Sequence, residues 1–548
     1  MVAACLALGT EAAPNSESAP APLTAVQGRA DGLVPAITAS IRRRLLWFDL
    51  ARRLATAAVI VAFLASFLAV REGAALGSTS PDLQMHPCVE GRSRVPAECG
   101  TFRVYENRAA HAGRTIDLGF ILLKAQHRSG HAIYFNPGGP GGPTTPYATL
   151  LTDKQPPKYA KPLWILRDRY DILLLDNRGM GESHSLDCSS IYSQVDPAPY
   201  YLEIWPSTAL RACRALQAED SDLSQYTTDN AVEDLNDLRA ALGYRKIVLA
   251  GDSGGTYFSL IYMRRHPGSV ESALLNGVAP PHLLIVPLDD AYGAQLAMND
   301  VIRECAADVA CHTNFPLLAQ HFAALARRFD RGPIAITIRN GSTHRLERVL
   351  LSKEVFADRL RQALYFSGFA KYVPLAIERA YRGNYLLLGE LIDSVTFFLA
   401  KSLDTGANLS YTCAEHLPFI TPAMIARASA GSFQGDTRVR AQQRACAIWN
   451  VRPVPVSENT IVRSTLPVLM VSGTNDPASP AIFAQQELPY LPNARLVLQR
   501  GASHTEESDC TVQLEVAFVL ARSAKGLNTT SCASSFHRPP FVLSYPGA

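Results

Sequence analysis

Seven short apolar runs, rich in isoleucine, valine and leucine, each end in a turn signal. They are residues 116–125, 132–142, 170–179, 246–255, 272–281, 466–477 and 494–504. Continuous apolar runs of this length are typical of strands that are buried on both faces of a parallel sheet. We therefore expect these segments to form one mostly parallel sheet.

Helical periodicity appears between the runs. Four apolar residues of segment 230–243 fall on one helix face: Val232, Leu235, Leu238 and Leu242. Gly243 then provides a helix stop. The alternation of strands and helices predicts an α/β, doubly wound domain.

The alternation breaks between about residues 284 and 457. Four apolar residues recur there at helical spacing: Leu318, Phe322, Leu325 and Phe329. Asn340-Gly341 is a turn signal within the same stretch and indicates one hairpin. We interpret residues 284–457 as a mainly helical lid, inserted between a first core part (78–283) and a second core part (458–548).

The N-terminal region predicts export. Residues 1–40 are rich in Ala, Pro, Ser and Thr without sustained periodicity, which indicates a disordered leader. Within residues 41–77, arginines precede 17 uncharged, mostly apolar residues (54–70). This pattern fits a signal peptide or an N-terminal membrane anchor, the only membrane contact that we expect. Either would place the rest of the chain in the periplasm or outside the cell.

Cysteine usage agrees with export. Ten cysteines follow the apolar segment: Cys88, Cys99, Cys188, Cys213, Cys305, Cys311, Cys413, Cys446, Cys510 and Cys532. An even number in an exported chain predicts disulfides, and we expect each cysteine to pair with its sequence neighbour. The 548 residues, 47% of them hydrophobic, suffice for a large core. The formal net charge of +3 gives no reason to expect a nucleic-acid partner.

The sequence GDSGG (251–255) allows two interpretations that share one nucleophile, Ser253. It resembles the nucleophile loop of trypsin-like peptidases, and it also fits the G-x-S-x-G elbow of α/β-hydrolases. A trypsin-like domain is all-β and carries its serine after the histidine and the aspartate. Here a buried strand precedes Ser253 and a predicted helix follows it, which favours the elbow and the α/β-hydrolase fold.

The elbow requires an acid and then a histidine later in the chain. Asp476 follows the apolar run LPVLMVSG, and His504 follows the run ARLVLQR. Ser253, Asp476 and His504 therefore form the predicted catalytic triad.

The oxyanion hole requires two backbone N–H groups. Gly254 provides one, and the loop NPGGPGG (136–142) provides the other through Gly139 or, as the second choice, Gly138. No Gly-Lys-Ser/Thr follows this loop, so it is not a phosphate loop. DNRGMGES (176–183) lacks the third glycine of a dinucleotide fingerprint, and we interpret it as a structural turn. The mechanism needs no metal and no cofactor.

Several motifs together resemble a known family. They are the Gly-Gly-Pro-Gly loop, D-x-R-G-x-G-x-S (176–183), YTTDNAVEDL (226–235), GDSGGTY, DPASP and GASH. They look like exported tripeptidyl aminopeptidases, relatives of the proline iminopeptidases among the serine peptidases of the α/β-hydrolase fold. That family often has Tyr where this chain has Gly254. The resemblance implies an aminopeptidase whose substrates are peptides with a free N-terminus.

In this family, acidic lid residues hold the substrate's ammonium group. Glu415 is our candidate, and a structurally paired carboxylate is the alternative interpretation. Two other functions remain open. One is an exported carboxylesterase or lipase-like hydrolase with the same triad, and the other is a non-catalytic binding protein on this fold.

Overall fold

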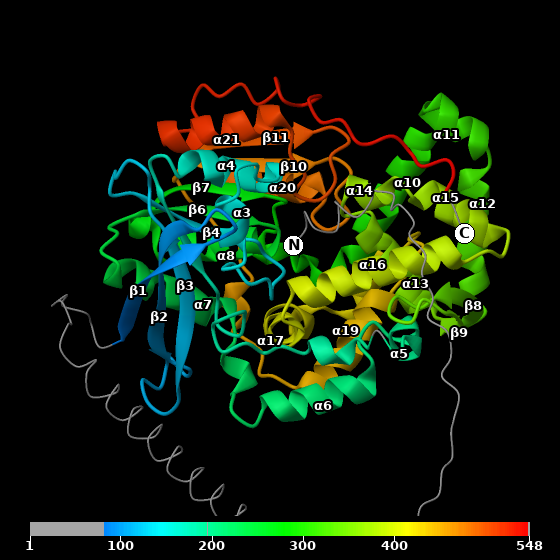
Figure 1. The fold of residues 1–548 in the computed structure, drawn as a ribbon, viewed down its shortest axis with the longest axis horizontal. Helices are drawn as coiled ribbons and strands as arrows, with labels where there is room; N and C mark the ends of the chain where they lie inside the picture. Colours follow the sequence, from blue (N-terminus) through cyan, green and yellow to red (C-terminus); the bar gives the residue numbers. More distant parts are fainter. Residues whose placement is uncertain (1–81, 194, 546–548) are drawn as a thin grey trace, which may run out of the picture. The chain divides into compact units, whose positions relative to one another are not determined.

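The computed structural model describes residues 82–193 and 195–545, so the predicted leader and the signal or anchor segment lie outside the described residues. Nine strands form one sheet in the order β1-β2-β3-β5-β4-β6-β7-β10-β11 (Figure 1). Their bounds are β1 Leu83–Glu90, β2 Val95–Tyr105, β3 Thr115–Leu123, β4 Ala132–Asn136, β5 Asp171–Leu175, β6 Ile247–Asp252, β7 Val270–Asn276, β10 Val468–Gly473 and β11 Ala494–Gln499. The strands from β1 to β5 in this order pair antiparallel, and those from β5 to β11 pair parallel.

All seven predicted runs are strands of this sheet, and the expected α/β fold with a mostly parallel sheet is confirmed. The sequence did not predict β1 and β2. These strands lie at the antiparallel end of the sheet, and several of their side chains are exposed. They therefore lack the continuous apolar run that reveals a strand buried on both faces.

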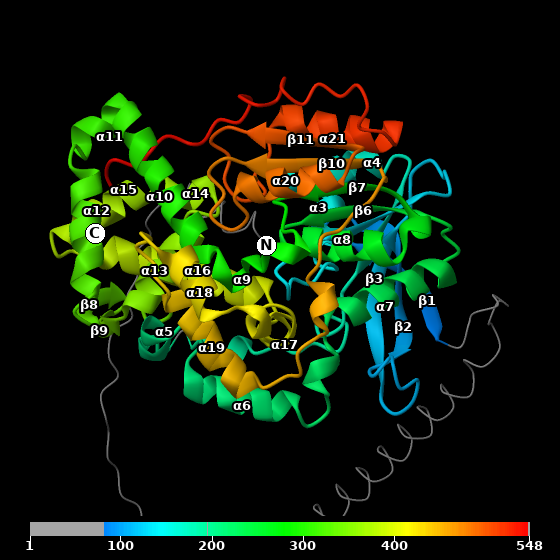
Figure 2. The same cartoon turned by 180° about the vertical axis from the view of Figure 1, so that it is seen from behind.

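Successive side chains of the strands point to opposite faces of the sheet and pack in two layers. In β6, Ile247 and Leu249 pack in the layer of α7 (Thr228–Ala241) and α8 (Gly254–Arg265). Val248 and Ala250 point to the other face. Three helices cover that face: α3 (Tyr147–Leu151), α4 (Lys161–Leu166) and α21 (Asp509–Ala521) (Figures 1 and 2). The sheet is thus covered by helices on both faces, as the sequence alternation predicts.

Between β7 and β10 the chain forms the stretch that we call the helical insertion, residues 284–457. Its helices are α9 Ile285–Leu288, α10 Asp290–Ala307, α11 Val309–Asn314, α12 Leu318–Phe329, α13 Lys353–Ala363, α14 Ser367–Ala370, α15 Val373–Tyr381, α16 Leu386–Ser402, α17 Thr405–Glu415, α18 Pro422–Ser429 and α19 Thr437–Trp449. One antiparallel hairpin, β8 (Ile334–Arg339) with β9 (Leu346–Leu351), encloses the predicted Asn340-Gly341 turn. The four apolar residues predicted on one face of α12 are all buried.

Two segments outside residues 284–457 also pack on the helical insertion. Tyr200 and Tyr201 of α5 (Ala198–Leu202) join its hydrophobic cluster, and α6 (Ser207–Gln217) packs on α19. The C-terminal tail, red in Figure 1, crosses from α21 to the insertion, where Phe541 is buried. The sequence analysis had assigned these segments to the two core parts, because their packing partners lie far away in the chain.

Five disulfides join the ten predicted cysteines, each to its sequence neighbour, which confirms the expected pairing. They are Cys88–Cys99, Cys188–Cys213, Cys305–Cys311, Cys413–Cys446 and Cys510–Cys532. Within residues 82–193 and 195–545, no helix has both the length and the apolar character needed to cross a membrane.

Candidate active site

Ser253 lies in a tight turn between β6 and α8. Its backbone has φ 54° and ψ −124°, a conformation that non-glycine residues rarely adopt and that functional sites often hold. A Cβ atom on Gly251 would lie 2.4 Å from the carbonyl oxygen of Gly255, and one on Gly255 would lie 2.1 Å from that of Asn136. Both glycines are therefore sterically required, and the strand–turn–helix context predicted for the elbow is present.

Asp476 and His504 follow the ends of β10 and β11, two neighbouring parallel strands. The Nδ1 atom of His504 lies 2.8 Å from Oδ2 of Asp476 and 3.0 Å from its Oδ1. Asp476 is fully buried and accepts hydrogen bonds from the N–H groups of Ala478 and Ser479 and from the Ser479 hydroxyl. The carboxylate is thus fixed on one side of the imidazole.

The environment of Asp476 favours its charged form. Burial works against the charge, but the imidazole of His504 and the N–H donors from residues 478 and 479 outweigh burial. The pKa of Asp476 is consequently below its usual value. An ionised Asp476 can orient His504 and stabilise its protonated form.

Ser253 and His504 both line one cavity of about 1000 Å³. Gly138 and Gly139 contribute to the same wall, and the helical insertion forms much of the opposite wall, for example through Phe366. The structure therefore brings Asp476 against His504 and places His504 and Ser253 on the surface of a shared cavity. This arrangement suits nucleophilic attack by a serine that a histidine activates.

The predicted oxyanion glycines meet at the elbow. A Cβ atom on Gly254 would lie 3.0 Å from the carbonyl carbon of Gly139. The Gly138 N–H donates to Oδ1 of Asn136 at 2.9 Å. Among the described residues, the N–H groups of Gly139 and Gly254 have no hydrogen-bond acceptor. These two N–H groups, rather than that of Gly138, are left for an anionic oxygen.

A model of the α/β-hydrolase fold matches residues 132–505 of this chain. The chain belongs to the α/β-hydrolase family.

Two relatives indicate which class of α/β-hydrolase this chain resembles. The serine protease Hip1 of Mycobacterium tuberculosis is 24% identical over 440 residues, which span 72% of this chain and 80% of that protein. The tripeptidyl aminopeptidase of Streptomyces lividans is 31% identical over 206 residues, which span 34% of this chain and 36% of that protein. They confirm the predicted resemblance and bear out the predicted enzyme class, a serine peptidase of the α/β-hydrolase superfamily.

Among solved structures, this α/β-hydrolase resembles a thermophilic esterase from Thermogutta terrifontis. The TM-score is 0.34 and the sequence identity is 13%, and the match covers 77% of this chain and 99% of that chain.

Glu415, the predicted ligand of a substrate ammonium group, ends α17 and lines a second, smaller cavity of about 50 Å³. Gly139 and Gly254 line the same cavity, so Glu415 lies close to the oxyanion glycines. The N–H and hydroxyl groups of Thr228 both donate to its carboxyl group, the hydroxyl at 2.9 Å. Burial raises the pKa of Glu415 to about 8, since these hydrogen bonds only partly compensate for it.

His416 is a cavity residue that the sequence analysis missed. It lines the small cavity beside Glu415, and its ring lies 5.1 Å from that of Tyr257. Its Nδ1 atom is buried and has no hydrogen-bond partner in the described part of the chain. Burial lowers the pKa of His416 to about 4, so the imidazole is neutral at pH 7.

The helical insertion also holds the His504 loop in place. The N–H of His504 donates to the carbonyl oxygen of Tyr365 at 3.0 Å. The N–H and hydroxyl groups of Ser367 donate to Oε1 of Glu506 at 2.9 and 2.7 Å. The Ser503 N–H donates to the other oxygen of Glu506 at 3.2 Å. No local sequence signal could reveal the contacts of Tyr365 and Ser367 with this loop, because they join segments more than a hundred residues apart.

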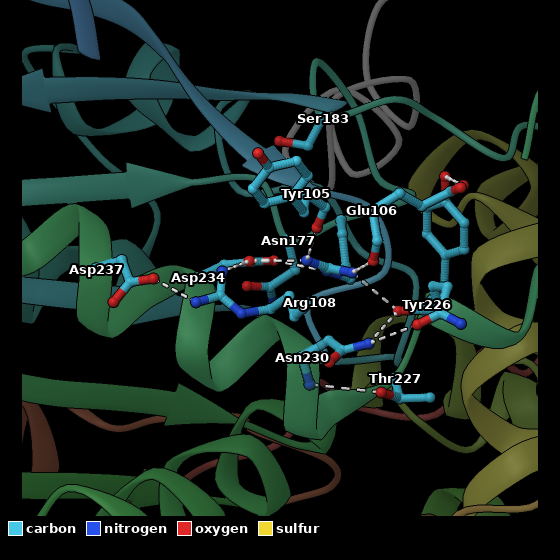
Figure 3. Close-up of polar contacts among 12 residues, drawn as sticks. Tyr105, Glu106, Arg108, Asn177, Ser183, Tyr226, Thr227, Asn230, Asp234 and Asp237 are labelled. Atoms are coloured by element: carbon cyan, nitrogen blue, oxygen red, sulfur yellow. Dashed lines mark hydrogen bonds and ion pairs between the residues drawn. The ribbon is translucent and has the colours of Figure 1, made fainter. Parts of the chain in front are cut away.

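The D-N-R-G turn has a structural role, as the sequence analysis expected. Asp176 accepts hydrogen bonds from the N–H and hydroxyl groups of Thr145, which follows the glycine loop. Arg178 is fully buried and donates to both carboxyl oxygens of Asp234 at 2.6 and 2.8 Å. Arg108 reaches Asp234 as well, at 2.7 Å, and also pairs with Asp237 (Figure 3). The turn thus ties the glycine loop and α7 to the sheet.

Proposed function

We propose that this chain is an exported serine aminopeptidase that releases short peptides or single residues from free N-termini. The observation that carries the proposal is the position of Glu415, a buried carboxyl group in a small cavity that also contains the oxyanion glycines. A cavity of this size, lined by Gly254, the residue after Ser253, can hold the charged end of a chain. The names of the two relatives support the same class of reaction.

The proposed reaction is acyl transfer. His504 takes the proton of Ser253 as the serine oxygen attacks the substrate carbonyl carbon, and Asp476 stabilises the imidazolium that forms. The N–H groups of Gly139 and Gly254 hold the oxyanion of the tetrahedral intermediate. His504 then gives the proton to the leaving amine, and water attacks the acyl-enzyme with His504 as the base.

Glu415 would bind the substrate's α-ammonium group. In the empty cavity its raised pKa keeps a large fraction of the carboxyl groups protonated at pH 7. An ammonium group placed beside the carboxyl group favours the ionised form and lowers the pKa, so binding is coupled to loss of a proton. A substrate without this charge leaves Glu415 protonated and gains no ion pair.

Export and a lid role belong to the same proposal. Five disulfides are expected of a protein that matures in an oxidising compartment. The helical insertion forms a wall of the large cavity and contacts the His504 loop, which supports a lid that shapes access to Ser253.

The test compares free and N-acetylated mono-, di- and tripeptidyl p-nitroanilides. We expect kcat/KM to favour the free amines by about 100-fold. An acetylated substrate cannot form the ion pair with Glu415, and loss of a buried ion pair has an effect of about this size. Glu415→Gln should reduce this preference to below about tenfold. Asp436→Asn, a substitution of a partly exposed carboxylate in the same insertion, should leave it unchanged.

The same panel separates the alternatives. Equal rates with free and acetylated amines would overturn the aminopeptidase and, together with fast cleavage of simple aryl esters, would show a carboxylesterase. Failure of the purified protein to react with a fluorophosphonate would instead indicate the non-catalytic binding protein.

A further inference from the structure

Asp252 immediately precedes the nucleophile and faces the opposite layer from the small cavity. It continues the row of Val248 and Ala250, which point toward α21. Asp252 lines the cavity of about 1000 Å³ together with Ser253. The proposed reaction does not use this carboxyl group.

Asp252 belongs to a part of the large cavity that we call the acidic lobe. The lobe consists of Tyr147, Tyr159, Asp252 and Glu507, which all line the cavity. The two tyrosine rings lie 6.3 Å apart in an edge-to-face arrangement. Burial raises the pKa of Glu507, and the neighbouring carboxyl group of Glu515 on α21 raises this pKa further.

The carboxyl groups of the lobe are incompletely hydrogen-bonded within the described residues. Within the described residues, the side chain of Asp252, which is partly exposed to the cavity, makes no hydrogen bond and no ion pair. Glu507 is 7% exposed, and although its Oε1 accepts from Asn276 at 3.0 Å, its Oε2 has no partner in the part of the chain that the structure describes. The hydroxyl group of Tyr159 is likewise buried without a partner there. Buried polar groups normally have partners, so Glu507 and Tyr159 call for one.

The nearby cations are already engaged. Lys158 and Lys161 pair with Asp509, at 3.4 and 3.1 Å. The Nδ1 atom of His504 faces Asp476. Burial, opposed only by the charge of His504, raises the pKa of Asp252 to about 7. Burial and the neighbouring carboxyl groups raise the pKa of Glu507 well above its usual value. The lobe therefore contains acids without a compensating positive charge.

We propose that the acidic lobe binds a cationic group of the substrate, the ammonium or guanidinium of a lysine or arginine side chain. A cation there would pair with Asp252 and lie near two aromatic rings, which attract cations. The proposal makes Asp252 a specificity-determining residue. It rests on the proposed function only for the peptide nature of the substrate. Perturbed, unpaired carboxyl groups beside a nucleophile are typical of functional sites.

The test uses free tripeptidyl p-nitroanilides in which each position in turn is lysine or norleucine. Norleucine keeps the aliphatic chain and removes the charge. We expect kcat/KM to favour lysine by about tenfold at one position at least, and Asp252→Asn to bring the lysine-to-norleucine ratio close to one. Asp509→Asn is the matched control, because the two lysines already neutralise that carboxylate, and it should leave the ratio unchanged. A ratio of one or less at every position, or an unchanged ratio in Asp252→Asn, would overturn the proposal.

The pH dependence of the wild-type ratio is a second test that needs no variant. A carboxyl group with a pKa of about 7 gains its negative charge as the pH rises, so the ratio should increase between about pH 6 and pH 8. Glu507, Glu515, Tyr147 and His504 are the titratable groups that face Asp252. His504 acts on both substrates, so its effect on the rate cancels in the ratio. A ratio that is flat over this range would contradict the proposal.

The source of the cation and the proposed function are tested separately. If the lysine and norleucine substrates react equally and Asp252→Asn instead lowers the preference for free over N-acetylated amines, the lobe binds the α-amine and not the side chain, which overturns the side-chain assignment. If the enzyme cleaves no amide, p-nitrophenyl esters of 6-aminohexanoic and heptanoic acid provide the same charged and neutral pair. Preference for the aminohexanoyl ester would then support the lobe while the aminopeptidase proposal fails.

Discussion

The polar groups around Asp476, at the carboxyl edge of the sheet, and those of the helical insertion differ in how completely they are hydrogen-bonded. At the sheet edge, Asp476 is fully buried yet accepts hydrogen bonds from two N–H groups, a hydroxyl group and His504. In the insertion, His416 is buried with an unpartnered Nδ1 among the described residues, and burial raises the pKa of Glu415 to about 8. The surroundings of Asp476 fix one charge state, whereas Glu415 in the insertion is a group whose charge depends on pH and on a ligand.

The difference follows from the backbone. The carboxyl ends of parallel strands continue into turns whose N–H groups are free to donate, as those of residues 478 and 479 do. The end of α17 offers no such donors to Glu415, which depends on Thr228 from another segment. We therefore expect substitution of Asp476 to affect the chemical step, and substitutions of Glu415 and His416 to affect substrate preference and stability.

The largest expected effect is that of Ser253→Ala. Loss of the nucleophile should reduce kcat on the best peptide substrate by on the order of 10⁶. The fold should persist, because the Ser253 N–H, and not its side chain, bonds to Asn276. Steady-state rates and thermal unfolding measure the two effects. Full activity in this variant would exclude Ser253 as the nucleophile.

The second largest effect is expected for Asp476→Asn, which should reduce kcat by about 10⁴-fold. The amide cannot stabilise the imidazolium and favours the wrong tautomer of His504. Glu506→Gln is the comparison, since Glu506 lies in the same loop as His504 but contacts Ser367 and Ser503. Its reduction of kcat should be far smaller. Equal losses in the two variants would contradict a special role for Asp476.

A smaller effect is expected on stability in acid. The pKa of His416 is about 4 in the folded protein and near 6.5 when unfolded, so protonation below pH 6.5 favours the unfolded chain. Between pH 6.5 and pH 4, the wild-type free energy of unfolding should fall by up to about 3 kcal/mol relative to His416→Gln. Urea denaturation at a series of pH values measures this difference.

The control for this experiment is His312→Gln, which changes an exposed histidine of the same insertion. Its unfolding curve should follow that of the wild type at every pH. If His416→Gln also follows the wild type, His416 is not held neutral by burial, and the contrast between the two regions disappears.

Much of the sheet could be predicted because its signal is local. Seven apolar runs became strands, and the elbow was recognisable from the strand and helix around Ser253. Asp476 and His504 could be selected because each follows such a run. β1 and β2 were missed because their partly exposed side chains give no continuous apolar pattern. The ties of α5, α6 and the C-terminal tail to the insertion were missed because they depend on contacts between distant segments.

The sequence by itself determined seven strands of the sheet and the order Ser253, Asp476, His504, because these are written in neighbouring residues or in their order. The disulfide pairing was an expectation that the structure bore out. Only the tertiary structure decided how Glu506 and Ser367 join the insertion to the His504 loop. It also showed that Asp252 faces the large cavity without a partner among the described residues. The physical reason is that hydrogen bonding and burial depend on which distant segments meet, and these two quantities set the charge of every buried acid in the site.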